Sequence, residues 1–193
     1  MAAPIFLIRH GETAWSLSGQ HTSHTDLPLT EQGERQAAAL RGALAGGAFT
    51  HVFTSPLRRA RRTAELAGWG EAARLEPLLQ EWNYGDYEGQ TSAAIQAERP
   101  GWNIYRDGCP AGESVEQVAA RADRLLAQLR PLEGRLALFS HGHFLRVLAV
   151  RWLGMPVRAG QHFSLDTASI SILDQESAHG AFPVIAQWNN APR

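Results

Sequence analysis

The sequence predicts a three-layer α/β/α sandwich built on a mainly parallel sheet, formed by a single domain that spans residues 1–193. Strand-like and helix-like segments alternate from one end of the chain to the other, which is typical of α/β folds. The 193 residues are 44% hydrophobic and 19% charged, the proportions of a globular protein that forms its own core. We find neither internal repeats nor low-complexity tracts.

In the first half of the chain, two predicted helices separate three predicted strands. The uninterrupted apolar run Ile5–Ile8 is typical of a strand buried on both faces. Thr30 is a typical helix N-cap, and Gly46 follows the last turn of that helix. Pro56 is predicted to occupy the first position of an arginine-rich helix that ends at Leu66. The two other predicted strands are His51–Thr54 and Leu75–Leu79.

The second half begins with an irregular stretch, residues 90–110, where glycines and prolines predict a short helix followed by an ordered flap. Ser114–Leu129 places its apolar residues on one helical face. Leu136–Phe139 is a second apolar run typical of a buried strand, and a helix is predicted from residue 144 to about residue 153. The last predicted strands are Ala168–Leu173 and Val184–Trp188.

Composition excludes several classes of function. The net charge is −1, so neither nucleic acid nor a membrane surface is an expected partner. All 18 basic residues are arginines, which excludes a Schiff-base lysine and the lysine of a phosphate-binding P-loop. The single cysteine, Cys109, excludes an internal disulfide and a CxxC site. The apolar run at the N-terminus is too short for a signal peptide, so we expect a cytoplasmic protein.

Two segments share a pattern in which an apolar strand is followed by histidine and glycine. They deliver His10 and His141 to the carboxyl ends of their strands, where open parallel sheets bind ligands. Arg9 and the arginine-rich segment Ser55–Thr63 add positive charge near a predicted helix N-terminus. Imidazoles, guanidiniums and helix amides that converge on one edge are typical of a phosphate site.

Each of these residues has an ordinary structural interpretation when taken alone. A single histidine at a strand end is usually a hydrogen-bonded structural residue, and arginines on one helix usually form a solvated face. Glu81 and Glu88, in isolation, are typical surface carboxylates. The phosphate-site hypothesis therefore depends on the combination of these groups.

Four motifs within residues 4 to about 150 carry a resemblance to a known family. They are Arg9–Thr13 with its Arg-His-Gly start, Ser55–Thr63, Glu81–Gly89, and Ser-His-Gly at Ser140–Gly142. In content and order they resemble the motifs of the histidine phosphatase superfamily, the phosphoglycerate mutase-like proteins. Three further segments resemble a subgroup that contains broad-specificity acid phosphatases and sedoheptulose-bisphosphatase-like proteins: residues 18–22, 25–30 and 108–114.

The resemblance implies a catalytic role for five residues. His10 would be the nucleophile that becomes a phosphohistidine, and Glu81 would donate a proton to the leaving alcohol. The groups around the phosphoryl oxygens would be Arg9, Arg59 and a protonated His141, with help from the backbone amide of Gly142. Because Arg59 is the arginine that matches the motif, three neighbours are expected on a solvated face: Arg58, Arg61 and Arg62.

This assignment agrees with the chemistry of phosphoryl transfer. The reaction places charge on the equatorial oxygens, so catalysis is mostly electrostatic stabilisation, and a nitrogen nucleophile divides it into two easier steps. Arginines and a protonated histidine supply the positive charge, so we expect no cofactor or metal and no effect of chelators. Glu81 must be protonated to act as an acid, so we expect a mildly acidic pH preference.

A polar loop, Gln20–Ser23, is expected to cover the site because it follows the nucleophile. We predict a small phosphorylated sugar, polyol or glycerate as substrate, and little binding energy from a second phosphate because few arginines remain. Trp82 and Trp102 are either apolar walls of the pocket or core residues. The predicted substrate-binding residues are Ser16, where family members often carry asparagine, Gln20, His21, Thr22, Ser23, Tyr84, Gly142 and His143.

Two alternative functions remain open. The first is a cofactor-dependent phosphoglycerate mutase; such mutases carry basic residues in an insert, and only Arg99 and Arg106 lie between residues 90 and 120 here. The second is a metal hydrolase that uses the histidine pairs at 21/24 and 141/143, although carboxylates at metal-ligand spacing and an HExxH motif are absent from the sequence. The sequence also leaves open a homodimer.

Overall fold

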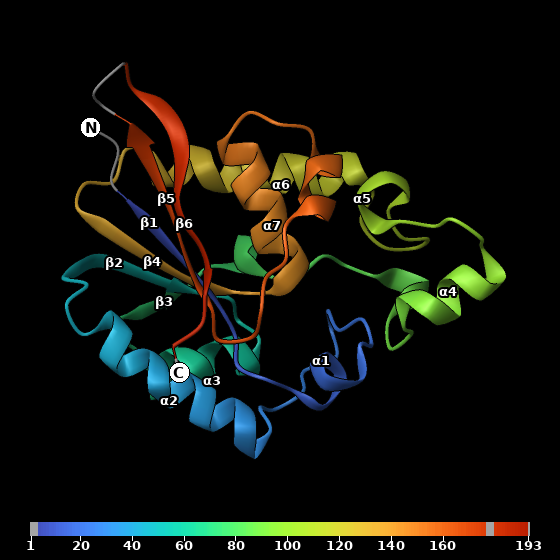
Figure 1. Cartoon of the computed structure of the whole chain (residues 1–193), viewed down its shortest axis with the longest axis horizontal. Helices are drawn as coiled ribbons and strands as arrows, with labels where there is room; N and C mark the ends of the chain where they lie inside the picture. The colour runs from blue at the N-terminus through green and yellow to red at the C-terminus, as the bar shows by residue number, and fades with distance from the viewer. Residues whose placement is uncertain (1–3, 177–179, 193) are drawn as a thin grey trace.

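The computed structural model describes residues 4–176 and 180–192, and helices cover both faces of its six-stranded sheet (Figure 1). The strand order is β3-β2-β4-β1-β5-β6. The first four strands of this order are parallel to one another, whereas β5 and β6 are antiparallel to their neighbours. The strands are β1 (Ile5–Arg9), β2 (Phe49–Thr54), β3 (Ala73–Leu75), β4 (Arg135–Ser140), β5 (Ile170–Glu176) and β6 (Phe182–Asn190).

Alternating side chains of the central strands build two cores, which confirms the predicted three-layer α/β/α fold. Leu7 and Leu138 pack with the buried face of α6 and α7, while Ile8 and Phe139 pack with α2 and α3 on the other face of the sheet. The helices that form these layers are α2 (Glu31–Leu44), α3 (Arg58–Leu66), α6 (Val115–Leu129) and α7 (Gly142–Trp152).

The predicted N-cap at Thr30 is confirmed by its hydrogen bond, and Ser114 caps α6 in the same way. The Thr30 side chain accepts from the Gly33 amide, and the Ser114 side chain accepts from the Gln117 amide. Pro56 does not begin its helix: Leu57 is the N-cap and α3 starts one residue later. The Arg58 amide there donates to Asp26 Oδ1 at 2.8 Å, a contact with a distant loop that the local sequence does not reveal.

The predicted strand Leu75–Leu79 was wrong in its bounds. β3 ends at Leu75, and a 3-10 turn, η1 (Pro77–Leu79), follows. Proline has no amide hydrogen for a sheet ladder, so the strand ends before residue 77. The antiparallel pairing of β5 and β6 was not specified either; a short connection between consecutive strands favours it.

Short helices surround the carboxyl ends of the parallel strands. α1 (Ala14–Ser18) was not expected, and the stretch predicted as one helix and a flap contains α4 (Ser92–Glu98) and α5 (Ile104–Asp107). Two further 3-10 turns are η2 (Gly85–Tyr87) and η3 (Val157–His162). Trp82 and Trp102 are core residues, exposed by 0% and 2%. Within the described ranges, no helix is both long and apolar enough to cross a bilayer.

Candidate active site

The carboxyl ends of β1 and β4 lie side by side and bring the two motif histidines together. Arg9 is in register with Ser140, the last residue of β4. The His10 amide donates to the Ser140 carbonyl at 3.0 Å. The rings of His10 and His141 lie 5.2 Å apart, measured between centroids. The convergence expected from strand order is therefore present.

The contacts of His10 define which nitrogen can act as a nucleophile. Nδ1 lies 2.7 Å from the Gly11 carbonyl, and because a carbonyl only accepts, Nδ1 carries the hydrogen. Burial, with the positive charges of Arg59 and Arg9, holds the pKa of His10 well below its ordinary value. The ring is thus neutral near pH 7 and keeps a lone pair on Nε2.

His141 lies behind His10 and is bonded through both ring nitrogens. Arg59 Nε donates to Nδ1 at 3.2 Å, and Nε2 lies 2.8 Å from Ser55 Oγ. Burial and the charge of Arg59 hold the pKa of His141 well below its ordinary value. With Nδ1 accepting from Arg59 and the pKa lowered, the ring is neutral near pH 7, which differs from the expected protonated imidazole; a phosphate dianion in the cavity would favour the proton.

Arg59 joins the histidine to a loop of the site. Its side chain is almost completely buried, and it donates to the carbonyls of Thr22, Ser23 and Thr25 at 3.0–3.3 Å. The other arginines of this segment, expected on a solvated face, are exposed: Arg58, Arg61 and Arg62.

Arg9 brings a guanidinium to the amino end of α7. Its Nη1 donates to the Leu165 carbonyl, while its Nε is buried without a hydrogen-bond partner among the described residues. A Cβ added at Gly142 would lie 3.3 Å from the Arg9 guanidinium carbon. Glycine at position 142 therefore allows the first turn of α7 to approach this cation closely.

Glu81 points its carboxylate at the same helix end. Its Oε1 accepts from the amides of Trp82 at 2.8 Å and Phe144 at 2.7 Å, and its Oε2 accepts from the His143 amide at 3.0 Å. Glu81 is buried and only 7% exposed. The first amides of α7 thus hold a carboxylate at the end of this helix, a common use of a helix N-terminus.

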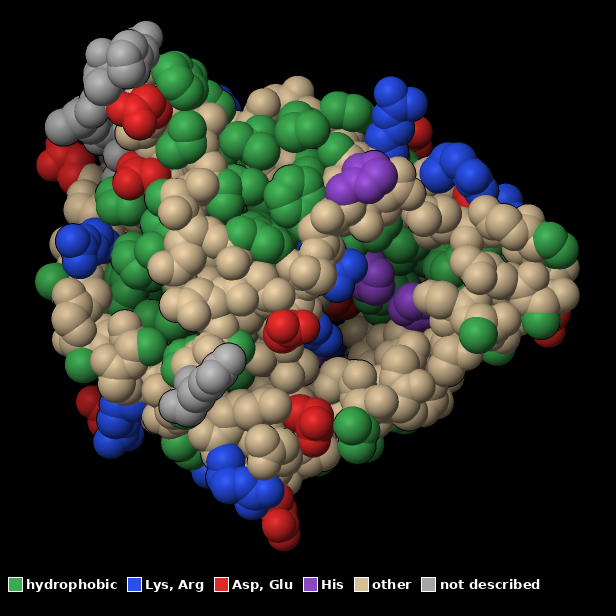
Figure 2. Space-filling model, viewed as in Figure 1, with side chains coloured by type: hydrophobic (Ala, Val, Ile, Leu, Met, Phe, Trp, Pro, Cys, Tyr) green, Lys and Arg blue, Asp and Glu red, His purple; other side chains and the backbone are tan. Residues whose placement is uncertain are grey.

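A cavity of about 190 Å³ opens between these groups. Figure 2 shows it as a hollow between the body of the molecule and the lobe that carries α4, with histidine and arginine side chains on its walls. Ten of the thirteen predicted site residues line it: Arg9, His10, Ser16, Gln20, His21, Thr22, Glu81, Tyr84, Gly142 and His143. Arg59 and His141 lie directly behind His10.

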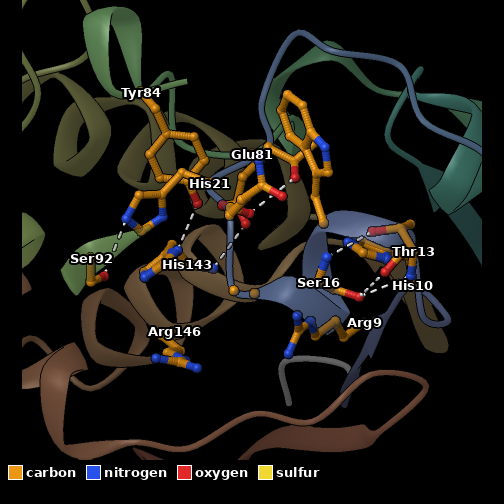
Figure 3. A pocket seen from close by; sticks show the side chains of 15 residues that line it. Arg9, His10, Thr13, Ser16, His21, Glu81, Tyr84, Ser92, His143 and Arg146 are labelled. Atoms are coloured by element: carbon orange, nitrogen blue, oxygen red, sulfur yellow. Dashed lines mark hydrogen bonds between the residues drawn. The ribbon is translucent and has the colours of Figure 1, made fainter. Parts of the chain in front are cut away.

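The end of the cavity away from His10 is built from aromatic and imidazole rings. Tyr84 Oη lies 2.7 Å from His143 Nδ1, and His21 stacks on Tyr84 with 4.6 Å between centroids (Figure 3). Ser92 Oγ of α4 lies 3.2 Å from His21 Nε2. Burial lowers the pKa of His21 to about 4 and holds that of His143 well below its ordinary value, so both rings are neutral near pH 7.

Three predicted substrate-binding hydroxyls make contacts within the protein. Ser16 Oγ accepts from the Thr13 amide at 2.9 Å and donates to the Thr13 carbonyl at 3.0 Å, which caps α1. Thr22 Oγ1 donates to the Gln20 carbonyl at 3.3 Å. Ser23 does not line this cavity; its hydroxyl donates to Glu88.

Glu88 orders the loop that carries Ser23. It accepts from the amides of Ser23 and Thr25 at 2.9–3.0 Å. Burial alone would raise the pKa of Glu88, but these hydrogen bonds more than offset it and hold the pKa below its ordinary value. Glu88 is therefore a structural carboxylate.

The cavity is also lined by residues that were not among the predicted site residues: Thr13, Trp15, Gly19, Ser92 and Arg146. Arg146 matters most because it adds a cation beyond those around His10. It lies three residues after His143 on α7, on the same helical face, and this spacing was the available signal. Among the described residues, no group of three or more histidine, cysteine, aspartate or glutamate side chains is arranged to hold a metal ion.

The fold and the site together define an enzyme built for phosphate chemistry, and comparison with known proteins identifies its family. The family model described as histidine phosphatase superfamily, branch 1, matches residues 5–191, so the chain belongs to this superfamily of phosphatases. The acid phosphatase of Mycobacterium tuberculosis is 45% identical over 181 residues, which cover 91% of this chain and 87% of that protein.

Other relatives carry different names. The sedoheptulose 1,7-bisphosphatase of Saccharomyces cerevisiae is 38% identical, over 79% of this chain and 68% of that protein. A protein of Cronobacter sakazakii named probable phosphoglycerate mutase GpmB is 35% identical, over 90% of this chain and 86% of that protein. Among solved structures, the product of the open reading frame Rv3214 of Mycobacterium tuberculosis superposes on this chain with a TM-score of 0.91. The two sequences are 38% identical, and the alignment covers 100% of each chain. The superfamily and fold expected from the motifs are thus confirmed.

Proposed function

We propose that this protein hydrolyses small phosphate monoesters, without a metal, through a phosphohistidine at His10. The observation that supports this most directly is the hydrogen bond between His10 Nδ1 and the Gly11 carbonyl. It leaves a neutral ring with its Nε2 lone pair free in a cavity that Glu81 also lines. A small phosphorylated metabolite is accordingly the proposed partner.

In the first step His10 Nε2 attacks phosphorus and forms the P–N bond as the P–O bond to the alcohol breaks. The electron pair of that bond stays on the leaving oxygen, which takes a proton from Glu81. Arg9 and Arg59 stabilise the charge on the equatorial oxygens. Arg9 directly precedes His10 at the end of β1, and Arg59 donates to His141, whose ring lies 5.2 Å from that of His10.

In the second step a water attacks phosphorus and gives a proton to Glu81, while the P–N bond breaks and its electron pair returns to His10. Glu81 is protonated again and free phosphate leaves, so protons and charges balance over the cycle. This scheme needs one carboxyl group that reaches both the leaving oxygen and the water. Glu81 is suited to the task because the amino end of α7 holds its carboxylate and it lines the same cavity as His10.

The proposed substrates are phosphorylated sugars, polyols or glycerates, since the cavity is small and its walls combine hydrogen-bonding side chains with aromatic rings. Arg146 changes one expectation from the sequence. A cation at the cavity wall would bind a second anionic group of the substrate, such as a second phosphate or a carboxylate. The bisphosphatase of yeast, a relative of this chain, acts by name on such a substrate.

A phosphoglycerate mutase is the second candidate, favoured by relatives with that name and by Arg146. Two observations argue against a mutase. Neither Arg99 nor Arg106 lines the cavity, and the Arg106 guanidinium donates hydrogen bonds to Asp107 and the Gly101 carbonyl instead. We therefore give preference to hydrolysis.

One experiment separates these functions. Purified enzyme is incubated with 3-phosphoglycerate, and release of phosphate is compared with formation of 2-phosphoglycerate, each with and without a chelator. We expect phosphate release to dominate and the chelator to have no effect. Faster interconversion than release would establish the mutase, and loss of activity with chelator would refute the metal-independent reaction.

A further inference from the structure

Glu81 lies in a segment without regular secondary structure. The 3-10 turn η1 ends at Leu79 and η2 begins at Gly85, so neither a helix nor a strand fixes the backbone of Glu81. The position of its carboxylate must therefore depend on contacts that other elements make with residues 78–83.

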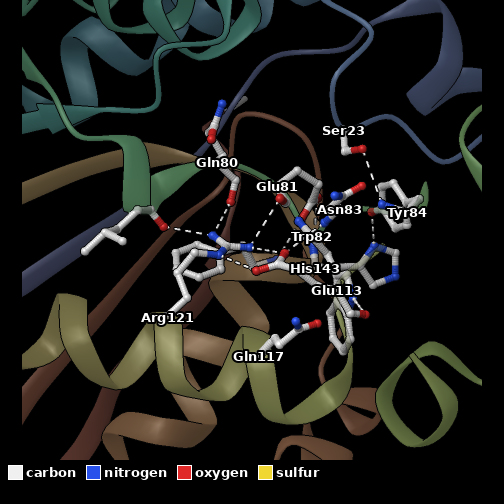
Figure 4. A network of polar contacts seen from close by, with 12 residues as sticks. Ser23, Gln80, Glu81, Trp82, Asn83, Tyr84, Glu113, Gln117, Arg121 and His143 are labelled. Carbon is white, nitrogen blue, oxygen red and sulfur yellow. Dashed lines mark hydrogen bonds and ion pairs between the residues drawn. The ribbon is translucent and has the colours of Figure 1, made fainter. Parts of the chain in front are cut away.

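Arg121 of α6 supplies three of these contacts (Figure 4). It is a buried arginine, 9% exposed, and all five of its N–H groups are used. Three donate to backbone carbonyls: those of Leu78 at 2.8 Å, Gln80 at 2.7 Å and Glu81 at 3.2 Å. The other two form a bidentate pair with Glu113, both at 2.7 Å.

Glu113 holds the other side of the same segment. Its Oε2 accepts from the Asn83 amide at 2.9 Å, and its own amide donates to the Asn83 carbonyl at 2.9 Å. Its carbonyl accepts from Trp82 Nε1 at 3.0 Å. The Arg121–Glu113 pair therefore forms hydrogen bonds with the backbone on both sides of Glu81.

The guanidinium also contacts the residue that holds the carboxylate itself. The central carbon of Arg121 lies 4.1 Å from the centroid of the Phe144 ring, a cation–π arrangement. The Phe144 amide donates to Glu81 Oε1 at 2.7 Å. Arg121 thus contacts both the backbone of Glu81 and the helix turn that orients its side chain.

We infer that Arg121 and Glu113 are positioning residues for Glu81, and that they hold its carboxyl in reach of the leaving oxygen. This inference rests on the proposed function, in which Glu81 is the general acid. A lysine at position 121 would keep the charge but offers a flexible ammonium with three donors, which cannot reproduce a planar group with five. The carboxyl would then be displaced, and proton donation would suffer more than phosphate binding.

The readout is the effect of the leaving group on kcat/KM, which covers the steps up to release of the alcohol. Glycerol phosphate has a poor leaving group that needs the acid, whereas p-nitrophenyl phosphate has a good one that needs it little. We expect Arg121→Lys to lower kcat/KM about 10- to 100-fold on glycerol phosphate, part of the ~10²–10⁴-fold that a general acid supplies, and less than about 3-fold on the nitrophenyl ester.

Arg151→Lys is the matched control. Arg151 forms a bidentate pair with Asp123 of α6, both contacts at 2.9 Å, and also donates to the Met155 carbonyl; these partners lie outside the Glu81 segment. Its variant should keep the wild-type ratio of the two esters. Glu113→Gln is a second test, because it retains Arg121 and one acceptor oxygen; the ratio should shift in the same direction as in Arg121→Lys.

Glu81→Gln separates failure of this inference from failure of the proposed function. If Glu81→Gln changes the ester ratio but Arg121→Lys and Glu113→Gln, folded by circular dichroism, keep the wild-type ratio, the pair does not position Glu81. Equal losses on both esters in these two variants would likewise show a purely structural role. If Glu81→Gln itself loses equally on both esters, Glu81 is not the acid, and the proposed function fails with the inference.

Discussion

The two ends of the cavity are built in different ways. At the end that we propose to be catalytic, hereafter the catalytic end, His10 and His141 follow adjacent parallel strands, and each ring is fixed by a contact to its own loop or to Arg59. At the distal end, Tyr84, His21 and their neighbours come from separate loops and from α4 and α7, and they hold one another by stacking and side-chain hydrogen bonds.

This difference explains where substrate specificity can vary. The catalytic end depends on the sheet, so changes there affect the reaction itself. The distal end depends on contacts among loop and helix side chains, so we expect changes there to alter which alcohol is accepted while the proposed phosphoryl site stays intact. The four predictions below test this division, from the largest expected effect to the smallest.

His10→Ala should remove turnover at the catalytic end entirely. Loss of a covalent nucleophile is expected to cost on the order of 10⁴-fold or more in kcat. Phosphate release and thermal unfolding are measured on the same sample, and quenching wild-type enzyme without acid should trap phosphate on residue 10. A folded variant with wild-type activity, or phosphate trapped on Ser140 instead, would contradict the mechanism.

Arg146→Met should affect the distal end only. Loss of a charged contact typically costs about 1.5–3 kcal/mol, so kcat/KM should fall roughly 10- to 100-fold for substrates with a second anionic group. A substrate with one phosphate and neutral hydroxyls should change less than about 3-fold. Arg99→Met, which alters an exposed arginine outside the cavity, is the control. Equal losses for both substrate types would place Arg146 at the phosphoryl site.

The sequence predicted those features of the fold and the site that depend on residues close together along the chain. The strand-end histidines, the motif around Arg59 and the cap at Thr30 each depend on neighbouring residues, and the structure has these elements as expected. Arg146 and Arg121 were missed because their roles come from tertiary contacts: Arg146 reaches the cavity and Arg121 reaches carbonyls about forty residues away in sequence. The three-residue spacing from His143 was a local signal for Arg146, whereas nothing in the sequence around Arg121 distinguishes it from a surface arginine.

Acid should weaken the distal end through His21. Burial lowers its pKa in the folded protein to about 4, below the ~6.5 of an unfolded histidine. The unfolded state therefore binds more protons between these values, so the free energy of unfolding falls as pH drops from 6.5 towards 4. His21→Gln should reduce this slope by up to about 1.4 kcal/mol per pH unit.

Denaturant unfolding of the ligand-free protein at several pH values measures this slope. His162→Gln replaces an exposed histidine of η3 and serves as the control, with the wild-type slope expected. Burial also lowers the pKa values of His10, His141 and His143, so the variant should keep part of the acid sensitivity. An unchanged slope in His21→Gln would show that this ring is not held neutral by the fold.

The smallest effect is expected for Ser16, which lines the cavity on the side of His10 (Figure 3). Its hydroxyl is bonded to the amide and the carbonyl of Thr13, so it caps α1 instead of offering its hydrogen to phosphate. Ser16→Ala should therefore cost about 0.5–1.5 kcal/mol of stability and change kcat/KM by less than about 3-fold. A tenfold rise in KM without loss of stability would show that the hydroxyl leaves Thr13 to bind substrate, and the capped helix would then belong to the phosphate site.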